Sequence, residues 1–290
     1  MNQQWVRAHP LPLHTDGTDK NSRGRVMVIG GSMDVPGGVR LTAEAALRAG
    51  AGKVRIGTVA PAALAIGAAF PEAAVAALPV NAEGEIDASP AALKLHLEKC
   101  DALVAGPAMS CPTQASRLLD IVLKILDKKG DIVIDAAALM SLSDNIGPLG
   151  DRIRPAVLTP HIGEIAAMLD TDAEIIERDR VSAARFAANR FNAIVALKGA
   201  KTIIAAPSGE VFCYEGGGIG LATSGSGDVL AGIVGGLLAR GCSPLEATLW
   251  AVWLHGEAGR ACARTIAPLG FLARELLTAI PGLMRIPHPG

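Results

Sequence analysis

A glycine-rich turn that leads into an apolar stretch holds the residues best suited to chemistry. It covers residues 222–232 and places one carboxylate, Asp228, at the expected start of a helix. The backbone amides of Gly225, Ser226 and Gly227 would face an anion there, and the positive end of the helix dipole would strengthen its binding. Asp228 could take a proton from a hydroxyl group that attacks a bound phosphate. The segment therefore predicts a phosphoryl-transfer site.

Composition narrows the possible functions. The 290 residues are 50% hydrophobic, with a formal net charge of -1 and 3% aromatic residues. A nucleic-acid binder would usually carry a basic face or stacking aromatics, so we expect no nucleic-acid partner. We also expect no membrane attachment, because no window holds the roughly eighteen consecutive apolar residues that a membrane helix needs.

The N-terminus and the cysteines indicate the cellular compartment. The first 24 residues are polar and lack the apolar core of a signal peptide, so a cytoplasmic location is expected. The five cysteines are scattered and form no Cys-x-x-Cys pair. They predict ordinary buried thiols, rather than a disulfide framework or a zinc site.

Alternating strands and helices must position the turn around Asp228. Apolar, β-branched runs predict six strands at residues 25–29, 54–59, 102–105, 131–134, 156–158 and 193–197. Ala/Leu-rich helical stretches lie between most of them, which indicates an α/β fold with a mainly parallel sheet covered on both faces. Further on, the sequence predicts a hairpin (202–206 and 210–214) and helices near 229–239, 245–263 and 269–280.

No linker or change of composition divides the chain. We therefore expect one catalytic domain at residues 25–285, preceded by a polar N-terminal extension at residues 1–24.

Ligands of open parallel sheets bind beyond the carboxyl ends of the strands, so the residues after each strand are candidate sites. Residues 30–38 form a glycine-rich turn that leads into a helix at 39–49, and a ligand could approach its backbone. A tight connection is the alternative reading there, as an ordinary turn is for residues 106–110. Asp135 could bind a ligand or cap the helix that follows it.

Two later loops carry polar side chains. His161 and Glu164 are three residues apart on a first helical turn and could point into one cleft, although a capping Glu is the alternative. Lys198 follows a buried strand, a costly place for a cation unless it meets an anion, which favours a nucleotide phosphate nearby. His255 lies in an apolar helical stretch and is expected to be structural. Because no GxxxxGK[ST] motif occurs, the turn before Asp228 would have to bind the phosphate itself.

Taken in order, these loops resemble the ribokinase-like superfamily, whose Gly-x-Gly-Asp motif corresponds to residues 225–228. The full set is similar to one branch, the ADP/ATP-dependent NAD(P)H-hydrate dehydratases, over roughly residues 25–260. The resemblance implies a three-layer αβα sandwich and a hydro-lyase that repairs hydrated NADH and NADPH. Such an enzyme phosphorylates the C6 hydroxyl group with ADP or ATP and then eliminates phosphate.

The resemblance also assigns roles to individual residues. Catalysis would use Asp228 with Gly225, Ser226 and Gly227. Nucleotide binding would use Lys198, Gly199, Ala200, Lys201, Thr202 and Gly227. Hydrate binding would use Gly38, Gly106, Ala108, Met109, His161 and Asp228. Glu164 would help to hold Mg²⁺ through water, a separate NAD(P)H-hydrate epimerase would act in the same pathway, and the chain would form a homotetramer.

Departures from the family pattern gather on the substrate side, so the substrate could differ from that of the family. Val35 replaces a Tyr, Gly38 an Ala, Ala108 and Ser110 two glycines, and Ala137 an Asp. Two other functions therefore remain as alternatives. One is a kinase for a hydroxymethylpyrimidine or hydroxyethylthiazole precursor, and the other is a non-catalytic nucleotide sensor, against which the intact Asp228 argues.

Overall fold

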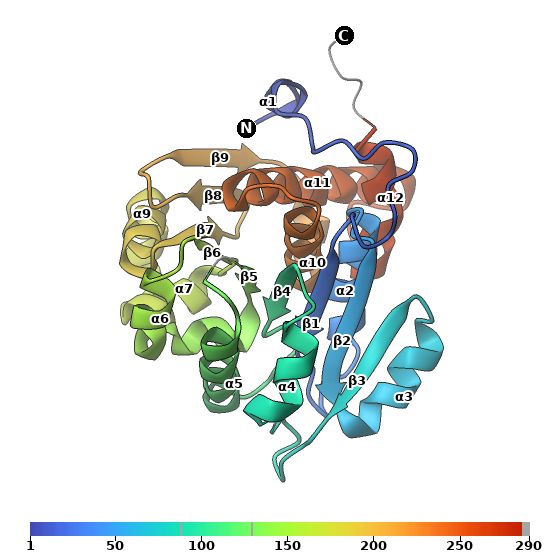
Figure 1. The fold of residues 1–290 in the computed structure, drawn as a ribbon. Helices are drawn as coiled ribbons and strands as arrows, with labels where there is room; N and C mark the ends of the chain where they lie inside the picture. The colour runs from blue at the N-terminus through green and yellow to red at the C-terminus, as the bar shows by residue number, and fades with distance from the viewer. Residues whose placement is uncertain (88, 129, 286–290) are drawn as a thin grey trace.

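The computed structural model describes residues 1–87, 89–128 and 130–285, and in them one nine-stranded sheet has the order β3-β2-β1-β4-β5-β6-β7-β8-β9 (Figure 1). The strands are β1 (Arg25–Ile29), β2 (Lys53–Val59), β3 (Ala73–Leu78), β4 (Ala102–Ala105), β5 (Asp131–Ile134), β6 (Ala156–Leu158), β7 (Ala193–Leu197), β8 (Lys201–Ala205) and β9 (Val211–Glu215). Strands β1 to β7 pair in parallel, and β8 and β9 are antiparallel.

Helices cover both faces of the sheet (Figure 1). They are α1 (Gln3–Ala8), α2 (Gly38–Arg48), α3 (Ala60–Ala69), α4 (Pro90–Leu97), α5 (Pro112–Ile125), α6 (Ile146–Gly150), α7 (Ile162–Leu169), α8 (Ala173–Arg178), α9 (Arg180–Phe191), α10 (Ser226–Ala239), α11 (Pro244–Thr265) and α12 (Ala273–Leu283), with 3₁₀ turns η1 (Ala136–Asn145) and η2 (Ile219–Leu221).

Alternate residues of the central strand β1 enter two different cores. Val26 and Val28 pack in the cluster that contains α2, α10, α11 and α12. Met27 and Ile29 pack in the cluster that contains α4, α5, α7 and α9. Burial on both faces explains why the strands are apolar throughout. The predicted three-layer α/β sandwich with a mostly parallel sheet is confirmed.

The six predicted parallel strands are confirmed, but the structure adds a seventh, β3. Its sequence, Ala-Ala-Val-Ala-Ala-Leu, is rich in alanine, which has little preference for strands. Pairing with β2 at the edge of the sheet overrides that local preference.

Two predicted boundaries shift for identifiable reasons. Each strand of the hairpin lies one residue farther from the turn than expected. Lys201 is paired with Glu215 at the strand ends, and their side chains are 2.7 Å apart. The last helix begins at Ala273 rather than at residue 269. Gly270 has a φ of +94° and Leu272 is extended, and both conformations are incompatible with the start of a helix.

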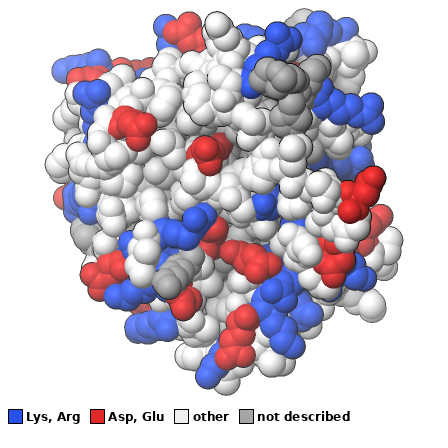
Figure 2. All heavy atoms as spheres, turned by 45° about the horizontal axis from the view of Figure 1, so that its top comes forward, with Lys and Arg blue, Asp and Glu red and all other residues white. Residues whose placement is uncertain are grey.

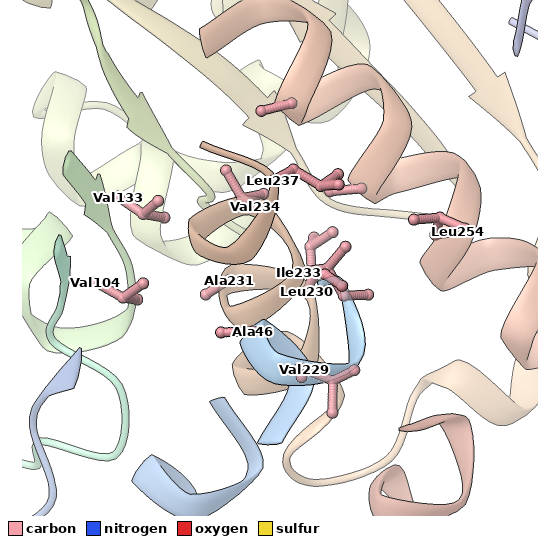
Figure 3. Packing of buried hydrophobic residues seen from close by; sticks show 14 of the residues in the cluster. Ala46, Val104, Val133, Val229, Leu230, Ala231, Ile233, Val234, Leu237 and Leu254 are labelled. Carbon is pink, nitrogen blue, oxygen red and sulfur yellow. The ribbon is translucent and has the colours of Figure 1, made fainter. Parts of the chain in front are cut away.

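Helix α10 is buried on all sides between the sheet, α2 and α11 (Figure 3). A Cβ at Gly232 would overlap the carbonyl oxygen of Thr42 on α2. A Cβ at Gly235 would come within 2.5 Å of Val104 Cγ2 on β4. Because only glycine permits these close approaches, α10 is held firmly against both α2 and the sheet. This packing fixes the position of its first turn, which contains Asp228.

The N-terminal extension packs on the same face of the sheet. Val6 on α1 is fully buried in the cluster that contains α11. The indole of Trp250 on α11 donates to the carbonyl oxygen of His9 (2.7 Å).

On the face drawn in Figure 2, charges of both signs surround a mostly uncharged area. Within the described residues, no helix has the length and apolar character needed to cross a membrane.

Candidate active site

Five of the predicted loops meet at one edge of the sheet, because β1, β4, β5, β6 and β7 run in the same direction. Hydrogen bonds join neighbouring loops. The amide of Gly31 donates to the carbonyl oxygen of Pro107 (2.8 Å), and that of Lys198 donates to the carbonyl oxygen of Pro160 (2.8 Å). The loops therefore form one continuous rim.

Lys198 binds two carboxylates from other loops. Its Nζ lies 3.0 Å from Asp135 Oδ1 and 3.7 Å from Glu164 Oε2. Asp135 is only 2% exposed and also accepts from the Thr159 hydroxyl (2.7 Å). Burial lowers the pKa of Lys198, but the two carboxylates outweigh it and raise that pKa above its ordinary value. Lys198 therefore stays charged, and the anions that it contacts in the structure are carboxylates of the protein itself.

The first turn of α10 presents free amides, although not all of those expected. Gly225 has a φ of +84°, and a side chain there would collide with Leu41. The amide of Ser226 donates to the carbonyl oxygen of Thr223 (3.2 Å), so it is not available to an anion. In the described part of the chain, the amides of Gly227 and Asp228 have no acceptor. These two amides, at a helix N-terminus, can bind a phosphate.

Asp228 has the protonation behaviour of a general base near neutral pH. Burial, together with the negative charge of Asp135, raises the pKa of its carboxyl group to about 7. The positive charge of Lys198 partly opposes this increase. A carboxyl group with this pKa is ionised often enough to accept a proton, and basic enough to hold it.

A cavity of about 780 Å³ opens beside α10, within the range of cofactor sites. Among the residues predicted to bind ligands, it is lined by His161, Lys198, Gly199, Ala200, Thr202, Ser226 and Gly227. Lys201 is not among them, because its side chain is 65% exposed and pairs with Glu215. The cavity is also lined by Tyr214 and His255, which the sequence did not assign to a site. Neither residue lies in a motif that could have identified it.

His161 and Glu164 form the cap of α7. His161 Nδ1 accepts from the amide of Glu164 (3.2 Å), and Glu164 Oε2 accepts from the amide of His161 (2.7 Å). The capping alternative is therefore confirmed. The His161 side chain is 59% exposed and also lines the cavity, whereas that of Glu164 is 9% exposed.

Two of the departures from the family pattern touch each other beside Asp228. A Cβ on Gly38 would lie 2.5 Å from the Cβ of Ala108 and 3.1 Å from Asp228 Oδ2. Ala108 has a φ of +56°, a left-handed conformation that favours glycine. One methyl group therefore occupies this contact, on residue 108 rather than on residue 38. Met109, the next residue, is 6% exposed and packs in the core.

This contact predicts a compensating pair of substitutions. Gly38→Ala is expected to destabilise the fold by about 1–3 kcal/mol, because two methyl groups would overlap. Ala108→Gly removes the obstacle and also relieves the left-handed alanine, so the double variant is expected to regain most of that loss. Denaturant unfolding of all four proteins tests this. Gly37→Ala is the matched control, since a Cβ there would meet nothing within 4 Å. An equal loss of stability in Gly38→Ala and in the double variant would exclude the coupling.

Comparison with known proteins identifies the family. A family model described as NAD(P)H-hydrate dehydratase matches residues 26–282. The chain is 43% identical to an ADP-dependent (S)-NAD(P)H-hydrate dehydratase from Xanthomonas campestris pv. campestris, over 98% of this chain and 95% of that protein. It is 36% identical to a bifunctional NAD(P)H-hydrate repair enzyme from Moorella thermoacetica, over 97% of this chain but 53% of that longer protein.

Solved structures agree. An ADP/ATP-dependent NAD(P)H-hydrate dehydratase from Bacillus subtilis, co-crystallised with ATP/Mg²⁺, has a TM-score of 0.79 at 27% identity, over 97% of this chain and 96% of that one. A ribokinase-like superfamily protein from Enterococcus faecalis has a TM-score of 0.83 at 25% identity, over 98% and 94%. By fold, sequence and the arrangement of its loops, this chain belongs to the NAD(P)H-hydrate dehydratase family.

Proposed function

We propose that the protein is an ADP-dependent (S)-NAD(P)H-hydrate dehydratase, with Asp228 as its general base. The observation that carries this proposal is the position of Asp228, a buried carboxyl group with a pKa of about 7. It directly follows Gly227, which has a free amide and lines the large cavity. The match to the Xanthomonas relative covers nearly the whole of both proteins, and the name of that relative supports the choice of substrate and co-substrate.

In this mechanism Asp228 accepts the proton of the C6 hydroxyl group while the hydroxyl oxygen attacks the terminal phosphoryl group of the nucleotide. The amides of Gly227 and Asp228 stabilise the charge on the transferring oxygens. The resulting phosphate is a far better leaving group than hydroxide, so the lone pair of the ring nitrogen can expel it. Loss of a proton from C5 then restores the dihydronicotinamide.

The nucleotide is assigned to the cavity beside Lys198. The Lys198 ammonium lies against the first turn of α10, since a Cβ on Gly227 would be 3.4 Å from its Nζ. Phosphate oxygens placed there would meet this cation and the free amides together. Gly199, Ala200 and Thr202 line the wall beyond. Lys201 can contribute only through its main chain, because its side chain pairs with Glu215.

Mg²⁺ fits as an ion held jointly with the nucleotide. Among the residues that the structure describes, no three His, Cys, Asp or Glu side chains form a group that could hold a metal. Mg²⁺ usually keeps several waters and binds through one or two carboxylates and substrate phosphates. Glu164, already bonded to Lys198 and to the amide of His161, suits a contact through water. The ion would neutralise charge on the phosphates, and the ATP/Mg²⁺ in the Bacillus crystals supports this assignment.

Partners follow from the same assignment. The chain spans about half the length of the bifunctional repair enzymes that it matches. We propose that a separate NAD(P)H-hydrate epimerase supplies the S form to this protein in the cytoplasm. A homotetramer remains a prediction, which sedimentation velocity would test.

The pKa of Asp228 predicts the acid limb of the activity profile. The base must be ionised, so kcat/KM for the hydrate is expected to rise about tenfold per pH unit below pH 7 and to level off above it. Steady-state rates between pH 5 and 9 test this, with a solvent-viscosity control to show that chemistry limits the rate. A profile that stays flat through pH 7 would contradict the assigned base.

Product analysis separates the proposed reaction from its alternatives. The protein is incubated with the (S)-hydrate of NADH and either ADP or ATP, and NADH, inorganic phosphate and the spent nucleotide are measured together. The proposal predicts equal amounts of all three, with ADP as the effective nucleotide. A parallel assay offers a hydroxymethylpyrimidine or hydroxyethylthiazole precursor with the same nucleotides, and a stable phosphate ester there, without NADH from the hydrate, would identify a kinase. Nucleotide binding without consumption in either assay would identify a sensor.

A further inference from the structure

His255, which the proposed reaction does not use, lies against the residue that opens α10. Its Nε2 is 2.9 Å from the hydroxyl oxygen of Ser226 and 3.0 Å from the main-chain carbonyl oxygen of the same residue. Ser226 is 5% exposed, and both residues line the cavity. The ring therefore reaches from α11 across to the anion-binding turn.

The two contacts determine where the ring carries its hydrogen. A carbonyl oxygen can only accept a hydrogen bond, so Nε2 must be the protonated nitrogen. Burial, with a smaller effect of the Lys198 charge, lowers the pKa of His255 to about 4 although the hydrogen bond to the Ser226 carbonyl oxygen acts to raise it, so the ring is neutral at pH 7. A neutral ring with its hydrogen on Nε2 cannot accept from the Ser226 hydroxyl group. That hydroxyl oxygen is therefore an acceptor here, and its own hydrogen is free to be donated elsewhere.

Among the first three residues of α10, the amides of Gly227 and Asp228 have no acceptor in the structure, whereas that of Ser226 cannot bind an anion because it donates to the carbonyl oxygen of Thr223. A free hydroxyl hydrogen on the same residue supplies a donor at that end of the turn. We infer that His255 is a positioning residue, which holds the Ser226 hydroxyl group as a hydrogen-bond donor toward the phosphoryl group bound at the start of α10. This inference rests on the proposed phosphoryl transfer, but its tautomer can be measured without any reaction.

The first test is the tautomer of His255 in the intact protein. A long-range ¹H–¹⁵N spectrum of histidine-labelled protein at pH 7 separates the two neutral forms by the shifts of the ring nitrogens. We expect the form protonated on Nε2. The form protonated on Nδ1 would overturn the inference, because the Ser226 hydroxyl group would then have to donate to the ring. Failure of this test would leave the dehydratase proposal intact.

The second test compares variants at both positions. His255→Gln keeps an N–H near the place of Nε2, whereas His255→Leu has similar bulk and no donor. Loss of one donor to a transition-state oxyanion lowers kcat by about a hundredfold, and we expect about tenfold for His255→Leu, which only leaves that donor unoriented. His255→Gln should stay within about threefold of the wild-type kcat. The KM for the hydrate should change little in either variant.

Non-additivity distinguishes positioning from a general structural role. Once Ser226→Ala has removed the hydroxyl group, adding His255→Gln or His255→Leu is expected to lower kcat no further. Multiplying losses, or equal losses in the Gln and Leu single variants, would overturn the inference. If His255→Leu fails to fold by its thermal melt, the tautomer measurement on the intact protein decides in its place. An enzyme that turns over no hydrate at all would instead refute the proposed function.

Discussion

Replacing Asp228 with Asn is expected to lower kcat for the hydrate by about a thousandfold, while the Kd for ADP changes no more than a few-fold. The amide has the size of the carboxyl group but cannot accept the proton of the attacking hydroxyl. Because the substitution leaves the main-chain amide of the turn in place, the phosphate site should remain. Rapid-mix kinetics measures the first quantity and calorimetric titration the second. Retention of more than a tenth of the wild-type kcat would show that another group is the base.

The same variant carries a signature in stability. The pKa of Asp228 is about 7 in the folded protein against 3.8 in the unfolded reference. Between these values the native state binds more protons than the unfolded state, so the carboxyl group makes the wild type less stable as pH rises from about 4 to about 7. Asn cannot titrate, and the loss of stability over that interval should be smaller in the variant. Identical pH profiles of Tm would contradict the raised pKa.

Replacing Lys198 with Met is expected to have the second-largest effect, on binding and on stability together. Asp135 and Glu164 would lose the cation that lies between them. Removing one partner of a buried ion pair costs about 3–5 kcal/mol, and protonation of the two carboxylates would recover part of it. The Kd for ADP should rise by at least about tenfold, because the phosphates would approach two uncompensated carboxylates. The acid limb of activity should also move to higher pH, since Lys198 lowers the pKa of Asp228.

Lys201→Met is the matched control for Lys198→Met. It removes a lysine three residues away, whose side chain is 65% exposed and lies outside the cavity. An exposed ion pair such as that with Glu215 is screened by solvent and contributes little, so stability should change little. Equal losses of ADP affinity in the two variants would show that general positive charge, rather than the buried position of Lys198, attracts the nucleotide.

The sequence predicted the sheet well, because strands buried on both faces must be apolar throughout. It missed β3, since an alanine-rich edge strand is stabilised by pairing with β2 and not by its own preference. The turn at Asp228 was recognisable because glycines, a carboxylate and an apolar helix are adjacent in the chain. For such a site the chemistry is local and can be read from a short segment.

The remainder of the site depends on contacts between distant segments. The sequence indicated that Lys198 meets an anion, but Asp135 is 63 residues away and only the sheet order brings them together. The contact of Gly38 with Ala108 could not be predicted either, because a left-handed alanine leaves no mark in the sequence. The role proposed for His255 could not be predicted from the sequence either, because it depends on a contact with Ser226 across two packed helices.

The central claim is that phosphorylation of the C6 hydroxyl group precedes its departure. The most direct measurement uses the (S)-hydrate of NADH labelled with oxygen-18 in that hydroxyl group, with ADP and the wild-type protein. If the hydroxyl oxygen attacks the phosphoryl group, mass spectrometry of the products will find the label in inorganic phosphate. Label in water, with unlabelled phosphate, would mean that the hydroxyl group leaves without being phosphorylated and would contradict the role assigned to Asp228.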